Sequence, residues 1–92
     1  MTEEKLSAEL TIQNKKGLHA RAAAAFVKTI APFDCEIEVE RIGQTVSGTS
    51  IMGLMMLAAA KDTTIKVSAS GNQAKEALEA VVALVNNKFG EE

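Results

Sequence analysis

The only histidine of the chain, His19, lies where a loop runs into a helix-forming segment. It stands in the run Gly17-Leu18-His19-Ala20-Arg21, so an arginine follows it two residues later. A neutral imidazole is a nucleophile that can attack a phosphoryl group, and a guanidinium can hold phosphate oxygens through two parallel hydrogen bonds. These residue types at this spacing predict phosphoryl chemistry at His19, with Arg21 stabilising the phosphate.

The backbone that follows His19 predicts a site for an anion. The amides of Ala20, Arg21 and Ala22 belong to the first turn of the expected helix, where they have no intrahelical partner. With the helix dipole they favour a negative group and disfavour a charged imidazolium. No carboxylate or second histidine lies near His19 in the sequence, which favours a carrier of phosphate over a hydrolase. The alternative is a surface histidine that caps the helix beside a solvated arginine.

The one cysteine, Cys35, predicts neither a metal site nor a nucleophile. Cys35 and His19 are the only soft ligands, and they are sixteen positions apart without the paired spacing of a metal site. Cys35 also falls on the inward phase of an expected strand, where a thiol packs as an inert core group. We therefore expect no metal and no cofactor.

A second candidate site is Ser50, which precedes a short apolar segment. We expect a helix over residues 50–57 with Ser50 as its N-cap. Phosphate on this hydroxyl would also lie at a helix N-terminus and would change the surface charge by about −2. Only one face of the helix can meet a sheet, so some of its apolar side chains must be exposed, which favours a partner-docking patch over an overpacked core. The apolar residues are Ile51, Met52, Leu54, Met55, Met56 and Leu57.

The elements that must position these residues are predicted by hydrophobic periodicity. Strands with one apolar face are expected over residues 6–13, 35–40, 44–47 and 63–69, and helices over 20–31, 50–57 and 73–89. Strands with one apolar face require a sheet that helices cover on one side only, which is a two-layer α+β sandwich. The stripe of the last helix includes Phe89, and residues 90–92 are expected to fray.

Length and composition are those of one small globular domain over residues 1–92, with 47% apolar and 24% charged residues. The net charge of −2 predicts no nucleic-acid-binding face. The longest apolar stretch, residues 51–60, is half a membrane span at most. A single cysteine and the absence of a signal-peptide pattern predict a cytoplasmic protein, and one small domain with a transient docking patch predicts a monomer.

The two candidate sites together resemble a known family. The run from Gly17 to Arg21, followed by Ala23-Ala24-Ala25-Phe26-Val27-Lys28, is similar to the phosphohistidine motif of HPr, the phosphocarrier of the bacterial phosphoenolpyruvate-dependent phosphotransferase system. The run Ser50-Ile51-Met52-Gly53-Leu54-Met55 is similar to the second motif of that family. The spacing between the motifs, the element order and the length agree as well, and the resemblance covers residues 6–89.

The resemblance implies a four-stranded antiparallel sheet of order 1-4-2-3 with three helices on one face. It implies that His19 accepts a phosphoryl group on Nδ1 from phosphorylated enzyme I and passes it to an EIIA-type protein, with Arg21 steadying the group. Ser50 would be the regulatory serine that an HPr kinase/phosphorylase modifies. Ile51, Met52 and Met55 would form the docking surface that the partners share. Such a protein is a stoichiometric carrier and not an enzyme.

One position departs from the family. Family members commonly have proline after the motif arginine, and this chain has Ala22, which adds a donor and a little freedom to the first helical turn. We expect the helix and the carrier function to persist. The sugar-uptake and nitrogen-regulatory branches both remain open. The competing hypotheses are a regulatory protein that docks partners through residues 50–57 without phosphoryl transfer, and a ligand-binding domain, for which only three aromatic residues are available to line a pocket.

Overall fold

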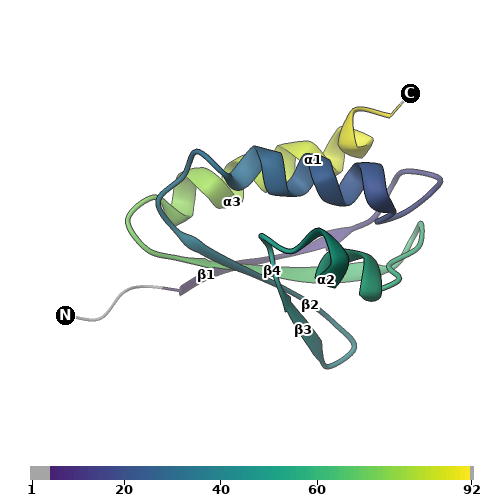
Figure 1. Ribbon diagram of the computed structural model, residues 1–92, viewed down its shortest axis with the longest axis horizontal. Coiled ribbons are helices and arrows are strands. Elements are labelled where there is room, and N and C mark those ends of the chain that lie inside the picture. Colours follow the sequence, from purple (N-terminus) through teal and green to yellow (C-terminus); the bar gives the residue numbers. More distant parts are fainter. Residues whose placement is uncertain (1–4, 92) are drawn as a thin grey trace.

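Four antiparallel strands form one sheet in the order β1-β4-β2-β3 (Figure 1). The computed structural model describes residues 5–91. The strands are β1 (Lys5–Thr11), β2 (Glu36–Arg41), β3 (Gln44–Ser47) and β4 (Thr64–Ser70). The sequence alternates between apolar and polar residues along β1, β2 and β4, so each strand contributes one apolar face to the sheet. The strand order 1-4-2-3 that the family resemblance implies is therefore confirmed.

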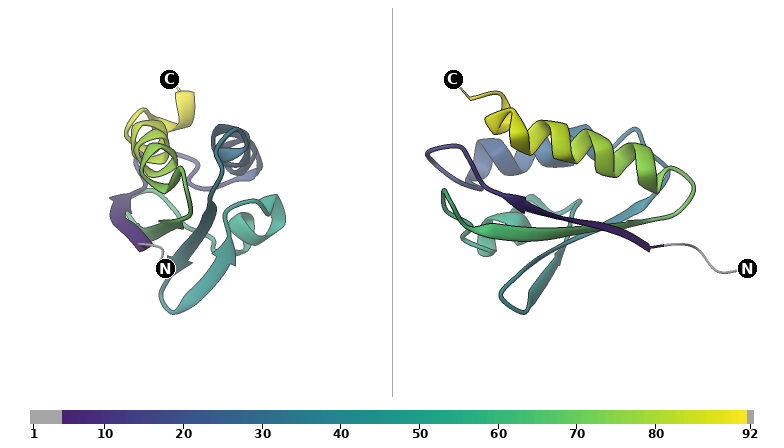
Figure 2. Two further views of the ribbon diagram at one scale, coloured as in Figure 1. Left: turned by 90° about the vertical axis from the view of Figure 1, so that its left-hand side faces the viewer. Right: turned by 180° about the vertical axis from the view of Figure 1, so that it is seen from behind.

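Helices α1 (Ala20–Ile30), α2 (Ile51–Met56) and α3 (Ala74–Asn86) lie on one face of this sheet (Figures 1 and 2). They meet it over a core that includes Phe26, Val39, Leu54, Val67 and Val81, all fully buried. The opposite face carries polar and charged side chains, as alternation requires. The α+β open-faced sandwich is therefore confirmed. Across residues 5–91, no helix is long and apolar enough to cross a membrane.

The chain departs from the predicted elements at its C-terminal end. Helix α3 ends at Asn86, three residues before the predicted end, and a 3-10 turn, η1 (Lys88–Gly90), follows. Lys88 and Phe89 both have left-handed φ values, 55° and 56°, so the helix cannot continue through them. The turn buries Phe89 against the core, where it is 6% exposed.

The prediction that the tail frays was wrong for the part that is described. Phe89 holds Gly90 and Glu91 against the molecule, and Glu91 is bonded to side chains near the start of α1. Glu92 lies outside the described residues.

Candidate functional site

His19 is the N-cap residue of α1, but its ring makes no hydrogen bond to the helix backbone. The backbone is extended there, with φ −85° and ψ −175°, and the side chain makes no capping hydrogen bond. The helix is started instead by the His19 carbonyl, which accepts from the amide of Ala23 at 2.8 Å. The side chain is 28% exposed. The helix-capping alternative for this imidazole is therefore wrong.

The loop that carries His19 is fixed by a close backbone approach at Gly17. Gly17 has a left-handed φ of 68°, and a Cβ placed there would lie 2.4 Å from the carbonyl oxygen of Ala59. The next amide, of Leu18, donates to that same oxygen at 2.9 Å, and the Leu18 side chain is buried. Only glycine fits this conformation and this contact, so the loop presents His19 from a rigid support.

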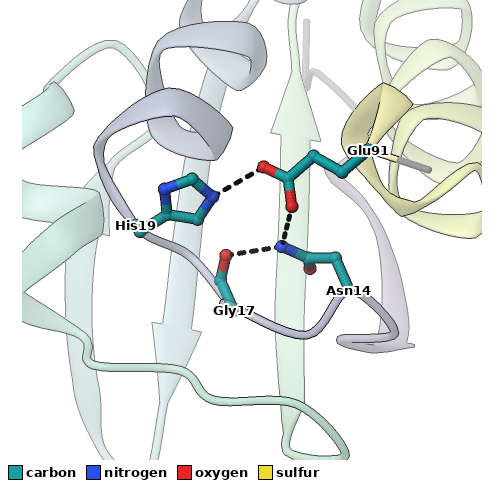
Figure 3. A network of polar contacts seen from close by, with 4 residues as sticks. All are labelled: Asn14, Gly17, His19 and Glu91. Carbon is teal, nitrogen blue, oxygen red and sulfur yellow. Dashed lines mark hydrogen bonds and ion pairs between the residues drawn. The ribbon is translucent and has the colours of Figure 1, made fainter.

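A hydrogen-bonded network holds one edge of the imidazole (Figure 3). Nε2 of His19 lies 2.6 Å from Oε2 of Glu91. The other carboxylate oxygen, Oε1, accepts from Nδ2 of Asn14 at 3.0 Å, and that amide group also donates to the Gly17 carbonyl at 2.8 Å. Figure 3 shows the second ring nitrogen on the side away from Glu91. The network therefore leaves Nδ1 without a partner among residues 5–91.

The carboxylate of Glu91 is stabilised in its charged form. The hydrogen bond from Asn14 lowers the pKa of Glu91 below its usual value, against the raising effect of burial, and the hydrogen bond and charge of His19 and the charge of Arg21 lower it further. Its side chain is only 16% exposed. At neutral pH this group is an ionised acceptor beside the imidazole.

The surroundings of His19 are rich in positive charge. The ring shares a shallow depression with Lys15, Lys16, Arg21 and Glu91, and both lysines and Arg21 are exposed at its rim. The first intrahelical bond of α1 starts at the Ala23 amide, so the predicted anion-binding amides of Ala20, Arg21 and Ala22 precede the hydrogen-bond ladder. The structure thus brings the amides, the guanidinium and the ring to one end of α1.

Sequence reasoning found His19 and Arg21 but missed Glu91 and Asn14. Glu91 lies 72 positions from His19, and no local spacing connects them. One signal was available: Phe89 was assigned to the apolar stripe of the last helix, and a buried side chain so near the tail predicts that the residues after it are held in place. The carboxylate that was absent near His19 in sequence is present in space, facing Nε2.

Ser50 lies at the start of α2 as predicted. Its Oγ accepts from the amide of Gly53 at 2.9 Å, and its carbonyl accepts from the amide of Leu54 at 2.9 Å. The N-cap assignment is therefore confirmed. The hydroxyl is half-buried.

Helix α2 exposes a large apolar face, as its composition predicts. Leu54 faces the core and is fully buried, whereas four side chains of the same helix are exposed. These are Ile51 (40%), Met52 (71%), Met55 (41%) and Met56 (66%). The overpacked-core alternative for this segment is wrong, because the methionines lie outside the core.

Cys35 is half-buried beside the sheet, just before β2. Burial raises the pKa of its thiol, and the charge of Asp34 raises it further. Both effects disfavour the reactive thiolate, in agreement with the interpretation of Cys35 as an inert thiol. In the part of the chain that the structure describes, no group of three or more His, Cys, Asp or Glu side chains could hold a metal ion.

Comparison with known proteins agrees with this fold and motif. Residues 6–87 match the family described as the PTS HPr component phosphorylation site. The phosphocarrier protein HPr of Pseudomonas aeruginosa is 50% identical over 84 residues, covering 90% of this chain and 93% of that protein. The phosphocarrier protein NPr of Shewanella violacea is 41% identical over 87 residues, covering 95% and 96%. The crystal structure of HPr from Thermoanaerobacter tengcongensis has a TM-score of 0.90 at 44% identity, covering 95% of this chain and 98% of that one.

The fold and the matched family model define the class of this chain as a phosphocarrier-type protein of the phosphotransferase system. Within that class, the chain belongs to the HPr family of phosphocarrier proteins. Its relatives include both HPr and NPr proteins.

Proposed function

We propose that His19 accepts a phosphoryl group from phosphorylated enzyme I and passes it to an EIIA-type protein. The observation that carries this proposal is the hydrogen bonding of the ring at the N-terminus of α1. Nε2 contacts Glu91, whereas Nδ1 has no partner among the described residues. A nucleophilic lone pair next to unpaired amides and a guanidinium favours both the attack on phosphorus and the anionic product.

The transfer is a displacement at phosphorus. The lone pair of Nδ1 on His19 forms a bond to phosphorus as the bond between phosphorus and the donor atom of enzyme I breaks, and that electron pair returns to the donor atom. Arg21 then pairs with the phosphoryl oxygens, and the amides of Ala20, Arg21 and Ala22 lie next to the new charge. In transfer to the EIIA-type protein, a nucleophile of that protein forms the new bond to phosphorus as the Nδ1–phosphorus bond breaks, and the electron pair returns to Nδ1 of His19.

The departure from the family pattern at Ala22 is compatible with this role. Ala22 is fully buried in the first turn of α1, and the helix forms from Ala20 onward without the proline that is common in the family. The extra amide at Ala22 is one more donor at the anion site. We therefore propose that carrier activity persists.

Docking of both partners is assigned to the exposed side chains of α2. Ile51, Met52 and Met55 offer an adaptable apolar surface, and methionine repacks readily against different partners. Phosphorylation of Ser50 by an HPr kinase/phosphorylase would place a charge of about −2 at the N-terminus of α2, where Oγ accepts from the Gly53 amide, and at the edge of this surface. Ser50 is thus the proposed regulatory residue.

The proposed setting is the cytoplasm, with the chain acting as a monomer, because the relay needs a small carrier that meets its partners in turn. The sugar and nitrogen-regulatory branches are distinguished by their acceptors. Phosphorylated protein offered to an EIIA-type protein of each branch should lose its phosphoryl group faster to the acceptor it serves.

The direct test is incubation with phosphoenolpyruvate and enzyme I, followed by intact-mass measurement. We expect the mass of one phosphoryl group to be added and lost again in acid, and we expect no adduct with His19→Ala. Ser50→Ala is the matched control and should still gain the mass of one phosphoryl group, because the proposed acceptor is His19. An adduct that survives in His19→Ala would refute the proposal. The docking alternative predicts that Ser50→Asp changes partner affinity while His19→Ala does not. It also predicts that the wild-type protein forms no phosphoryl adduct.

A further inference from the structure

We propose that Glu91 is a positioning residue for the phosphoryl acceptor: its carboxylate holds the neutral His19 ring with the proton on Nε2, so that Nδ1 presents its lone pair. The inference deepens the proposed function and rests on it. It assigns a role in the site to the C-terminal turn, residues 87–91.

The direction of the hydrogen bond follows from the chemistry of its partners. An ionised carboxylate only accepts hydrogen bonds, so at 2.6 Å from Oε2 of Glu91 the Nε2 atom of His19 must carry the proton. A neutral imidazole carries one proton, which leaves Nδ1 unprotonated.

The carboxylate is held in turn by a buried amide. Asn14 is 1% exposed, and its Nδ2 donates both to the Gly17 carbonyl and to Oε1 of Glu91. A reversed amide would bring its oxygen against two acceptors, so the orientation of Asn14 is fixed by these partners. Its Oδ1 is buried without a hydrogen-bond partner in the described part of the chain. Asn14 therefore leaves its carbonyl oxygen without a hydrogen bond, while its amino group donates to both Gly17 and Glu91.

The C-terminal turn adopts a strained conformation that delivers Glu91 to this place. Lys88 and Phe89 are consecutive non-glycine residues with left-handed φ values, and Gly90 follows with φ 77°. Such a run is unfavourable for residues with a Cβ, and backbone strain of this kind collects at functional sites. Burial of Phe89 anchors the turn, and the Glu91 amide donates to the Lys88 carbonyl at 3.0 Å. The conformation is maintained by packing and points the carboxylate at the ring.

The contact between Glu91 and Nε2 also stabilises the His19 ring after it has accepted the phosphoryl group. When Nδ1 bonds to phosphorus and Nε2 keeps its proton, the ring gains a positive charge, which faces the carboxylate of Glu91 across the 2.6 Å contact. Attraction to this charge stabilises the phosphorylated ring while Arg21 and the α1 amides stabilise the phosphoryl oxygens.

Two substitutions of Glu91 test the proposal because they act in different ways. Glu91→Ala removes the acceptor and releases the ring. Glu91→Gln keeps the size of the side chain but replaces one acceptor oxygen by a donor. Asn14 needs an acceptor at the position of Oε1, so the oxygen of the glutamine takes that place and the amino group of the glutamine faces Nε2 of His19. A donor there demands a lone pair on Nε2, which moves the ring proton to Nδ1 and blocks the nucleophile. Glu79→Gln, an exposed carboxylate on α3, is the matched control.

The first measurement is the ring tautomer of the free protein, from two-bond proton–nitrogen correlations in a ¹⁵N-labelled sample at a pH where the ring is neutral. We expect the Nε2–H form in the wild type and in Glu79→Gln, a mixture in Glu91→Ala, and mainly the Nδ1–H form in Glu91→Gln. The second measurement is the initial rate of phosphorylation by enzyme I, which should fall by about tenfold in Glu91→Ala and further in Glu91→Gln.

An unchanged tautomer in Glu91→Gln, or rates within twofold of the wild type for both variants, would overturn the role of Glu91 while leaving His19 as the acceptor. A wild-type protein that takes up no phosphoryl group would refute the proposed function instead. The tautomer is measured without enzyme I, so the two failures are distinguishable.

Discussion

The support of the His19 loop predicts that Gly17→Ala damages both stability and phosphoryl acceptance. Gly17 and Gly43 are both left-handed, with φ 68° and 77°, but their surroundings differ. A Cβ at Gly17 would lie 2.4 Å from the Ala59 oxygen and 2.9 Å from the Ala60 Cα, whereas a Cβ at Gly43 would meet nothing within 4 Å. Gly43→Ala is therefore the control that carries the backbone strain without the overlap.

The magnitudes follow from this difference. Alanine in a left-handed conformation costs about 1–2 kcal/mol, partly offset by about 0.4–1 kcal/mol from the lower entropy of the unfolded chain. Gly43→Ala should thus lower the free energy of unfolding by about 1 kcal/mol. Steric overlap in a packed region adds about 1–3 kcal/mol, so Gly17→Ala should lose about 2–4 kcal/mol.

Urea denaturation followed by circular dichroism measures both variants. With a slope of roughly 1 kcal/mol per molar urea for a small domain, the midpoint should fall by about 2–4 M in Gly17→Ala and by about 1 M in Gly43→Ala. Phosphorylation of His19 by enzyme I should slow in Gly17→Ala and stay unchanged in Gly43→Ala, under conditions where both are folded. Equal losses of stability in the two variants would refute the argument that the contact with Ala59 fixes the loop.

Three further predictions concern other positions. Ile42 is 85% exposed and left-handed (φ 49°) at the tip of the β2–β3 hairpin. Asparagine tolerates this conformation better than isoleucine, so Ile42→Asn should raise the free energy of unfolding by about 1 kcal/mol. A lower free energy of unfolding, measured by urea denaturation, would contradict this prediction. Arg21 is exposed beside His19, so Arg21→Ala should slow phosphoryl transfer about tenfold or more and leave the free energy of unfolding within about 0.5 kcal/mol of the wild type. Equal transfer rates would count against its phosphate role. The lowered pKa of Glu91 stabilises the folded state at pH values above the ordinary glutamate value of about 4.3. The difference in stability between wild type and Glu91→Ala should therefore shrink as the pH falls from about 4.3 through the lowered pKa. A difference that stays unchanged over this range would contradict the network.

The sheet and helices could be predicted because each follows from a local pattern. Alternation in β1, β2 and β4 fixes which strand side chains are buried, and the core confirms them. The spacing of alanines did not fix the buried face of α1, which is formed by Ala22, Ala23, Phe26 and Ile30. The exposure of Met52 and Met55 was also predictable, since a helix that is apolar all round cannot bury every face. His19 and Arg21 could be proposed as site residues from the sequence because they are only two positions apart along the chain.

What could not be predicted depends on contacts between distant segments. The burial of Phe89 was expected, but the left-handed turn that achieves it was not, because lysine and phenylalanine rarely adopt positive φ. The contact of Glu91 with His19 depends on that turn, and the role of Asn14 depends on both. The part of the site proposed to select a ring nitrogen thus depends on tertiary contacts, whereas the part proposed to bind phosphate is local in sequence.

The central claim is that a single ring nitrogen, Nδ1 of His19, carries the phosphoryl group. Nuclear magnetic resonance of the ¹⁵N-labelled protein after incubation with phosphoenolpyruvate and enzyme I tests it most directly, since phosphorus coupling identifies the bonded nitrogen. We predict coupling to Nδ1 of His19 and retention of the proton on Nε2. Coupling to Nε2, or a phosphoryl group on any other residue, would contradict the account.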